Sequence, residues 1–423
     1  MTDRRAMLGA LVGAAGASLA GCASPSPAAP AAAATKTALY RNVGDVLEHF
    51  EVDADAATLT RRGVVRLPAG LQYAWPHPSR QVLYATSSNR GSDLPGEVHH
   101  LSALRIDPVT GALQALGAPV PLKARSIHMS VDREGHFVLV AYSEPAGVSV
   151  HCIEADGRIG DEVAQPAALQ LGIYPHQILA APGNRKVLLV SRGHNAHGGK
   201  PEDPGVLHLL RFENGVLTPL QSVAPNGGYG FGPRHLDFHP TQPWVFVSLE
   251  RQNRLDVFQL DGERLSSAPL FSRSTLGQPD QVRPRQLPSA IHVHPNGSVV
   301  YVANRGLATE PFNGRNVFQG GENTISVFAI HPRTGEPTLI QSIDTRAYHV
   351  RTFALDASSR LLVAASIAPM NVREGDRVTA VPARLSVFRV LADGRLEFVR
   401  TYGVATEKNF QWWMGMVGLP AVT

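Results

Sequence analysis

A turn followed by a short apolar run recurs six times along this chain, and this alternation is the strongest structural signal in the sequence. The clearest copies are His239–Ser248 and His294–Ala303, in which a His-Pro turn precedes a run rich in Val, Phe and Tyr. The other copies are His77–Ala85, Asp132–Ala141, Ala181–Ser191 and Asp356–Ala365. The first residues of successive copies lie 49 to 62 positions apart in the sequence. Each run has the length and the β-branched content of a buried strand.

Each repeat holds more than this one strand. A second run usually follows, such as Arg254–Leu260 or Asn323–Ile330, and then a polar turn such as Pro332–Pro337. A repeat of this length accommodates about four strands, which is the unit of a β-propeller. We therefore predict an all-β fold of four-stranded antiparallel blades.

The two ends of the chain are complementary in this pattern. Ala38–Asp53 has the form of a second and third strand without a first, and Phe410–Leu419 has the apolar density of a first strand alone. Joined in one sheet they make a seventh blade, which closes the ring and leaves no free edge at the junction. We predict a seven-bladed β-propeller over residues 38–423. An open sandwich with a second domain is disfavoured because no linker separates the copies.

The first residues predict export from the cytoplasm. Arg4 and Arg5 precede an uncharged apolar stretch that is too short to span a bilayer, so residues 1–21 are interpreted as a twin-arginine-like signal. Leu-Ala-Gly-Cys ends at Cys22 and resembles a bacterial lipobox, which makes Cys22 the expected lipidation site. A plain signal peptide cut nearby is the alternative.

The segment after Cys22 has the composition of a linker. Residues 22–37 consist mostly of Ala, Pro and Ser, which cannot build a core, so we expect a flexible tether. Signal, Cys22 and tether together predict a protein exported across the inner membrane and held in the periplasm by a lipid anchor.

The composition limits the classes of molecule that this protein is expected to bind. The chain has 39 Lys and Arg against 35 Asp and Glu, and no basic cluster repeats along one face, which disfavours nucleic-acid binding. With Cys22 lipidated, Cys152 is the remaining cysteine of the 2 in the chain, so no intramolecular disulfide is expected. We expect a monomer whose partners are the membrane and a small molecule.

Propeller geometry predicts where a site lies. Successive strands of a blade run in opposite directions, so the start of the first strand and the end of the second share one face of the disc. Residues five and four places before each copy, and eleven places after its first residue, should therefore converge on one funnel. In chain order these sets are Gln72, Ile127, His176, Arg234, Ser289 and Arg351; Tyr73, His128, Gln177, His235, Ala290 and Thr352; and Ser88, Ser143, Arg192, Glu250, Arg305 and Ile367.

The predicted rim has one carboxylate, Glu250, among arginines and histidines. Arginines bind carboxylate or phosphate and stabilise an oxyanion, and Glu or His can move a proton. Ester or lactone hydrolysis requires these groups, while a pocket that only binds an acidic ligand is the alternative. No Gly-x-Ser-x-Gly, Cys-x-x-Cys, His-Glu-x-x-His or P-loop motif occurs, which disfavours serine, thiol and nucleotide chemistry. No cofactor is predicted, and a divalent metal stays open.

Other histidines have structural interpretations. His77, His239 and His294 begin repeat turns, where an imidazole can bond to the backbone. His194 and His197 lie in a Gly-rich insertion that opposes a helix, so we favour a solvated loop over a metal site.

The segments Gly232–Glu250 and Ser289–Gly306 resemble the lactonase family of seven-bladed propellers, which includes 6-phosphogluconolactonase and a 3-carboxy-cis,cis-muconate lactonizing enzyme. The likeness runs from about Ala38 to the C-terminus. Two features depart from the family: Ser191–Gly193 stands where many members carry an acidic residue, and residues 307–321 are an insertion after Gly306.

The resemblance implies roles for rim residues that the geometric argument also selects. The catalytic set it implies is His176, Arg234, Glu250 and Arg305. His235 and Arg351 also match family positions, and His128 joins them from the rim argument as a substrate-binding residue.

These observations lead to one main hypothesis and two alternatives. The main hypothesis is a 6-phosphogluconolactonase-like hydrolase that opens an acidic, sugar-derived or aromatic-derived lactone. Glu250 or His176 would activate water, and Arg234 and Arg305 would hold the acidic group and the forming oxyanion. The first alternative is a cycloisomerase that closes a muconate-type diacid to a lactone. The second is a non-catalytic lipoprotein that binds or scaffolds.

Overall fold

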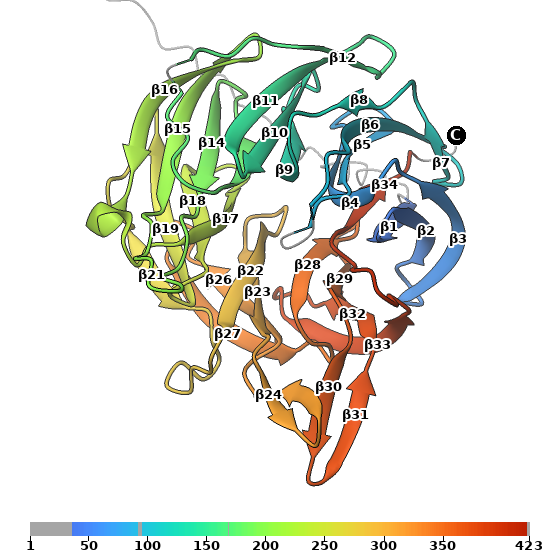
Figure 1. The fold of residues 1–423 in the computed structure, drawn as a ribbon. Helices are drawn as coiled ribbons and strands as arrows, with labels where there is room; N and C mark the ends of the chain where they lie inside the picture. The colour runs from blue at the N-terminus through green and yellow to red at the C-terminus, as the bar shows by residue number, and fades with distance from the viewer. Residues whose placement is uncertain (1–35, 92–94, 168, 421–423) are drawn as a thin grey trace, which may run out of the picture. The chain divides into compact units, whose positions relative to one another are not determined.

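The strands of this protein form seven antiparallel blades around a central axis, as the repeat pattern predicts (Figure 1). The computed structural model describes residues 36–91, 95–167 and 169–420. The predicted signal, Cys22 and nearly all of the tether lie outside them, and the first strand already begins at Thr37. Among the described residues the single helical element is the 3-10 turn η1 (Pro225–Gly228), and none is a helix long and apolar enough to cross a membrane.

Six blades are continuous in sequence, and in each the first strand is innermost. Blade one contains β4 (Gly70–Pro76), β5 (Val82–Ser88), β6 (His99–Ile106) and β7 (Leu113–Ala115), with β8 (Val120–Pro121) also on β6. Blade two contains β9 (Ser126–Val131), β10 (Phe137–Ser143), β11 (Ala146–Ile153) and β12 (Ile159–Glu162). Blade three contains β13 (Pro175–Ala180), β14 (Lys186–Ser191), β15 (Val206–Glu213) and β16 (Val216–Val223).

The later blades follow the same plan. Blade four contains β17 (Pro233–Phe238), β18 (Trp244–Leu249), β19 (Arg254–Asp261) and β20 (Arg264–Leu265), with β21 (Phe271–Ser274) also on β19. Blade five contains β22 (Gln286–Val293), β23 (Val299–Gly306), β26 (Thr324–Ile330) and β27 (Pro337–Asp344). Blade six contains β28 (Val350–Leu355), β29 (Leu361–Ser366), β32 (Ala383–Val390) and β33 (Leu396–Val404).

The seventh blade joins the two ends of the chain and confirms the predicted closure. Its innermost strand is β34 (Met414–Gly418), followed outward by β1 (Thr37–Val43), β2 (Val46–Asp53) and β3 (Thr58–Arg66). β34 pairs antiparallel with β1 from Thr37↔Gly418 to Arg41↔Met414. Because this ladder joins strands from the two ends, the ring has no open sheet edge at its junction.

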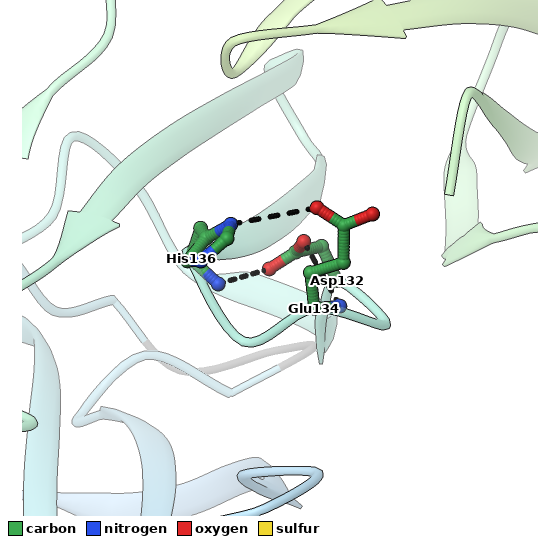
Figure 2. A group of neighbouring side chains, drawn as sticks. All are labelled: Asp132, Glu134 and His136. Carbon is green, nitrogen blue, oxygen red and sulfur yellow. Dashed lines mark hydrogen bonds and ion pairs between the residues drawn. The ribbon is translucent and has the colours of Figure 1, made fainter. Parts of the chain in front are cut away.

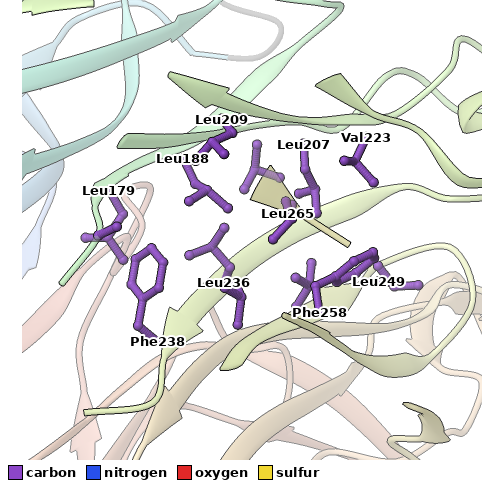
Figure 3. Close-up of a cluster of buried hydrophobic side chains, with 14 of the residues drawn as sticks. Leu179, Leu188, Leu207, Leu209, Val223, Leu236, Phe238, Leu249, Phe258 and Leu265 are labelled. Carbon is purple, nitrogen blue, oxygen red and sulfur yellow. The ribbon is translucent and has the colours of Figure 1, made fainter. Parts of the chain in front are cut away.

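Apolar side chains fill the space between neighbouring blades. Between blades three and four, for example, Leu188 and Leu209 face Leu236, Leu249 and Phe258 in one buried cluster (Figure 3). The second strand of every blade is buried along its length, which explains why its sequence reads as an unbroken apolar run rather than an alternating one.

Two β-hairpins extend from adjacent blades. The predicted insertion forms β24 (Thr309–Phe312) and β25 (Arg315–Phe318) between β23 and β26. A second hairpin, β30 (Met370–Glu374) and β31 (Arg377–Val381), follows β29 and was not predicted. The two hairpins lie side by side in Figure 1, where Asn371 donates a hydrogen bond to the carbonyl of Asn316 at 3.1 Å.

The imidazoles of the His-Pro turns bond to backbone within their own turns, as predicted, and those of His77 and His239 also contact the neighbouring blade, whereas among the described residues His294 Nδ1 accepts only the amide of Asn296 in its own turn. His239 Nδ1 accepts hydrogen bonds from the amides of Thr241 and Gln242 within its own turn, and Nε2 lies 3.1 Å from the carbonyl oxygen of Gly297 in the next blade. His77 makes the equivalent contact with Gly135 at 3.0 Å. The imidazoles of His77 and His239 therefore each fix a turn and link it to the next blade.

This contact requires glycine in the neighbouring turn. Gly297 has φ +74°, and a Cβ there would lie 2.5 Å from His239 Nε2. Gly314 has nearly the same φ, +73°, with nothing within 4 Å of its Cβ position. Both Gly→Ala changes carry backbone strain of about 1 kcal/mol. We predict that Gly297→Ala lowers the free energy of unfolding by about 1 to 3 kcal/mol more than Gly314→Ala does, measured by urea denaturation. Equal losses would contradict the role of the imidazole contact.

Candidate active site

A β-bulge at the start of the inner strand displays the predicted rim residues. In β17 the ladder pairs Pro233 with Leu249 and then His235 with Ser248, so Arg234 is left over. The leftover residues of the equivalent bulges in β4, β9, β13 and β28 are Gln72, Ile127, His176 and Arg351. A bulge redirects a side chain out of the regular pleat and is common beside active sites. The sequence positions five places before each repeat are thus positions where the ladder leaves a residue unpaired.

The centre of the site is an ion cluster around Glu250, the residue that follows β18. Its Oε1 lies 2.5 Å from Arg305 Nη2 and 3.3 Å from Arg234 Nε, and its Oε2 lies 2.6 Å from Arg192 Nη1. Glu250, Arg234 and Arg305 are buried, and Arg192 is partly buried. We call these four residues the Glu250 cluster. It contains three of the four predicted catalytic residues, and Arg192 is the addition.

The charges of this cluster determine the protonation of its carboxylate. Burial by itself would raise the pKa of Glu250, but the positive charges of Arg192, Arg305 and Arg234 together outweigh burial and hold that pKa far below its usual range. Both carboxylate oxygens face guanidinium groups. Glu250 is therefore an ionised counter-ion that fixes three arginines, and it is a poor proton acceptor.

The predicted histidines lie next to this cluster and are uncharged at neutral pH. His176 and His235 have ring centroids 5.1 Å apart, and His235 lies 5.9 Å from His128. Burial, followed by the positive charge of Arg234, lowers the pKa of His176 and His235 well below 6.5 and that of His128 to about 3. A neutral imidazole has one lone pair that can accept a proton or a hydrogen bond. His128 Nδ1 already accepts the amide of Ile178 at 3.4 Å, and His235 Nδ1 lies 3.5 Å from Arg234 Nη1. His176 Nδ1 has no partner among the described residues.

Several buried polar atoms of the site have no hydrogen-bond partner among the described residues. They include His176 Nδ1, His128 Nε2 and Arg305 Nε. Buried groups of this kind are costly to leave unpaired. Their concentration at one end of the channel indicates a place prepared for a polar ligand.

Three residues outside the predicted set also belong to the site. Arg305 Nη1 donates to His349 Nε2 at 3.2 Å, and Arg192 stacks on Tyr174 with its Cζ 4.4 Å from the ring centroid. Tyr174 and His349 both have φ +57°, an unusual conformation for residues other than glycine. Neither occupies a repeat position, so the sequence offered no signal for them. Arg192 did occupy one of the predicted rim positions, and the departure of Ser191–Gly193 from the family pattern was the available signal.

The arginine side of the cluster borders an open cleft. A cavity of about 560 Å³ is lined by Arg192, Glu250, Arg285 and neighbouring residues. A larger cavity of about 700 Å³ lies at the opposite ends of the inner strands, where Asp237 and His292 approach to 3.8 Å. The Asp237 oxygens there already accept the amides of Phe238 and Val293, so we place the candidate site at the Glu250 cluster.

Two other polar groups have structural explanations. Asp132, Glu134 and His136 gather in the turn between β9 and β10 (Figure 2), but Asp132 Oδ1 accepts the amides of His136 and Phe137 and Oδ2 accepts Asn184 Nδ2. His194 pairs with Asp203 at 2.8 Å and Glu144 at 3.0 Å. The exposed loop predicted around His194 and His197 is thus joined to the neighbouring loop that carries Glu144 by a hydrogen bond between His194 and that carboxylate.

The fold and the site together define a seven-bladed β-propeller with a cluster of buried arginines and histidines around Glu250 near one mouth of its channel. The sequence profile described as lactonase, 7-bladed beta-propeller, matches residues 31–374. The chain therefore belongs to the lactonase family of seven-bladed β-propellers.

Individual proteins agree with this assignment. The 6-phosphogluconolactonase of Bacillus subtilis (strain 168) is 26% identical over 353 residues, which cover 80% of this chain and 90% of that protein. A periplasmic gluconolactonase from Pseudomonas aeruginosa superposes with a TM-score of 0.67 at 18% identity, covering 91% of this chain and 100% of that one. A protein from Lactobacillus plantarum gives 0.66 at 20% identity, covering 91% and 100%. At these identities the two solved structures support the fold.

The buried histidines predict how stability depends on pH. In the folded protein the pKa values of His128, His176, His235 and His349 are lowered, chiefly by burial, whereas unfolded histidines bind protons below about pH 6.5. Stability is therefore full above that pH and falls as the pH drops. Each histidine should add about 1.4 kcal/mol per pH unit to the slope below pH 6.

Urea denaturation between pH 5 and pH 8 measures this slope. His128→Gln should reduce the number of protons taken up on unfolding by about one, and so lower the slope by about 1.4 kcal/mol per pH unit. The matched control is His197→Gln, in the exposed loop. A slope unchanged by His128→Gln would contradict the inferred neutral state of the buried ring.

Proposed function

We propose that this protein hydrolyses a lactone that carries an acidic group. The observation that supports this most directly is the buried His176, whose Nδ1 has no hydrogen-bond partner among the described residues and whose ring lies beside the arginines of the Glu250 cluster. Family membership and the relative named 6-phosphogluconolactonase support the same chemistry. The cations of the site favour an anionic substrate.

In the proposed reaction His176 acts as the general base. It takes a proton from water while the water oxygen attacks the lactone carbonyl. The carbonyl oxygen becomes an oxyanion that Arg234 and Arg305 stabilise, and Glu250 keeps both guanidinium groups in place. The ring C–O bond then breaks, and the proton held by His176 passes to the leaving alkoxide, which gives the open hydroxy acid.

The electrostatics decide between the two candidate bases in this proposal. Glu250 has both oxygens engaged by arginines and a pKa far below its usual range, because three guanidinium charges outweigh the effect of burial. His176 is neutral and has an unpartnered Nδ1 among the described residues. Glu250 is thus assigned as a positioning residue and His176 as the catalytic one.

The test is lactone hydrolysis by purified variants across pH. His176→Gln should lower kcat by roughly 100-fold or more, the usual contribution of a general base. In the wild type the pKa of His176 is lowered by burial and by Arg234, so kcat/KM should stay nearly constant from pH 7.5 to pH 6 and fall only at lower pH. Glu250→Gln should also abolish turnover, through displaced arginines.

Circular dichroism and gel filtration serve to check that these variants remain folded. His197→Gln, in the exposed loop, is the matched control for a histidine change. Full activity of His176→Gln, or an acidic limb of kcat/KM centred at or above pH 6.5, would contradict the assignment of the base.

We also propose that the protein is exported and anchored in the periplasm through a lipid on Cys22. The support is the sequence around Arg4, Arg5 and Cys22, which lies outside the described residues. Cys22→Ala should move the protein from the membrane fraction to the soluble periplasmic fraction, and Arg4→Lys with Arg5→Lys should retain it in the cytoplasm. Unchanged membrane association of Cys22→Ala would contradict the anchor.

A further inference from the structure

We propose that Arg351 and Arg125 form a separate subsite that binds the carboxylate or phosphate of the substrate, while the Glu250 cluster and His176 act on the lactone carbonyl. This inference rests on the proposed function, since it divides the same funnel into an anion-binding part and a reacting part.

Arg351 is presented to the channel without a counter-ion. It is the bulge residue of β28, and its guanidinium lies over the ring of Trp412, with Cζ 4.7 Å from the centroid. No carboxylate of the described residues pairs with it. Burial, followed by the charges of Arg305 and Arg125, lowers its pKa to about 10, so it stays charged at neutral pH.

Arg125 is a second cation that is fixed but not neutralised. It immediately precedes β9, and its Nε donates to Gln72 Oε1 at 2.8 Å. Gln72 is itself buried at the bulge of β4, and its Nε2 donates to the carbonyl of Gly70 at 3.0 Å. This chain of contacts holds the guanidinium in place, and its other N–H groups have no hydrogen-bond partner among the described residues.

The distribution of charge separates the two parts of the funnel. In the Glu250 cluster a carboxylate already occupies Arg192 and Arg305, each at hydrogen-bond distance. Neither Arg351 nor Arg125 has such a partner among the described residues, and the positive charge of Arg125 adds to burial and to the charge of Arg305 in lowering the pKa of Arg351. An anion bound between them would relieve that repulsion and gain charge-assisted hydrogen bonds. Carboxylate and phosphate oxygens are the groups whose geometry a guanidinium matches.

The inferred arrangement identifies the substrate class more closely. The acidic group binds beside Trp412 and Gln72, on the blades opposite the Glu250 cluster, so it must be separated from the lactone carbonyl by part of the substrate's own skeleton. A lactone whose acid group lies at the far end from the ester carbonyl fits this description. Arg125 thereby becomes a specificity-determining residue that its sequence position did not indicate.

The kinetic test compares a charged and a neutral lactone of the same ring. Arg351→Met and Arg125→Met should each raise KM for 6-phosphoglucono-δ-lactone by roughly 10- to 100-fold, while kcat and KM for neutral glucono-δ-lactone stay within about twofold. Arg264→Met, at an exposed position of β20, is the matched control. Equal losses with both lactones would overturn the subsite, because they would show that the arginines support the reacting part.

A second measurement keeps the subsite testable without turnover. Calorimetric titration of the full wild-type chain with inorganic phosphate and with succinate should show binding that Arg351→Met weakens by at least about tenfold. Tighter binding of one anion than the other would distinguish phosphate from carboxylate substrates. If the wild type hydrolysed neither lactone, the proposed function would fail, while anion binding lost in Arg351→Met would still support the subsite. No binding of either anion would overturn it.

Discussion

The constraint on which the site depends is the neutralisation of several buried arginines by one carboxylate. Arg234 and Arg305 are removed from water near the propeller axis, and Glu250 contacts both while also pairing with Arg192. Burial of so many cations without a counter-ion would cost more than a single domain could sustain. Burial, and after it the positive charge of Arg234, lowers the pKa of the neighbouring His176 and His235, so these rings stay uncharged beside the ion cluster.

The propeller provides the geometry that this cluster requires. Its members come from blades three, four and five, and they meet because the bulged start of each inner strand and the end of each second strand lie at the same mouth of the channel. Ring closure through β34 and β1 fixes the inner strands with respect to one another. Rigid strands therefore hold charged groups that would repel one another on a flexible loop.

Much of the fold could be predicted because the turns and apolar runs that specify each blade lie close together in the sequence. The turn, the apolar run and the two incomplete ends were sufficient for seven blades, and the repeat also located Arg234, Glu250 and Arg305. The division of roles could not be predicted, because it depends on distances between side chains about 55 to 60 residues apart in the chain. Tyr174, His349 and the hairpin β30–β31 lie outside the repeat, so no periodic signal marked them.

The central claim is that Glu250 serves as a permanently ionised counter-ion and does not exchange a proton during catalysis. Carbon-13 NMR of protein labelled at the glutamate carboxyl carbon tests it directly, with Glu250→Gln used to assign the resonance. An ordinary glutamate is about half or more protonated at pH 4. Because three arginine charges hold the pKa of Glu250 far below its usual range, its signal should remain that of a carboxylate from pH 7 down to the lowest pH at which circular dichroism shows the protein still folded. A signal that titrates while the protein is folded would contradict the account and return Glu250 to the position of candidate base.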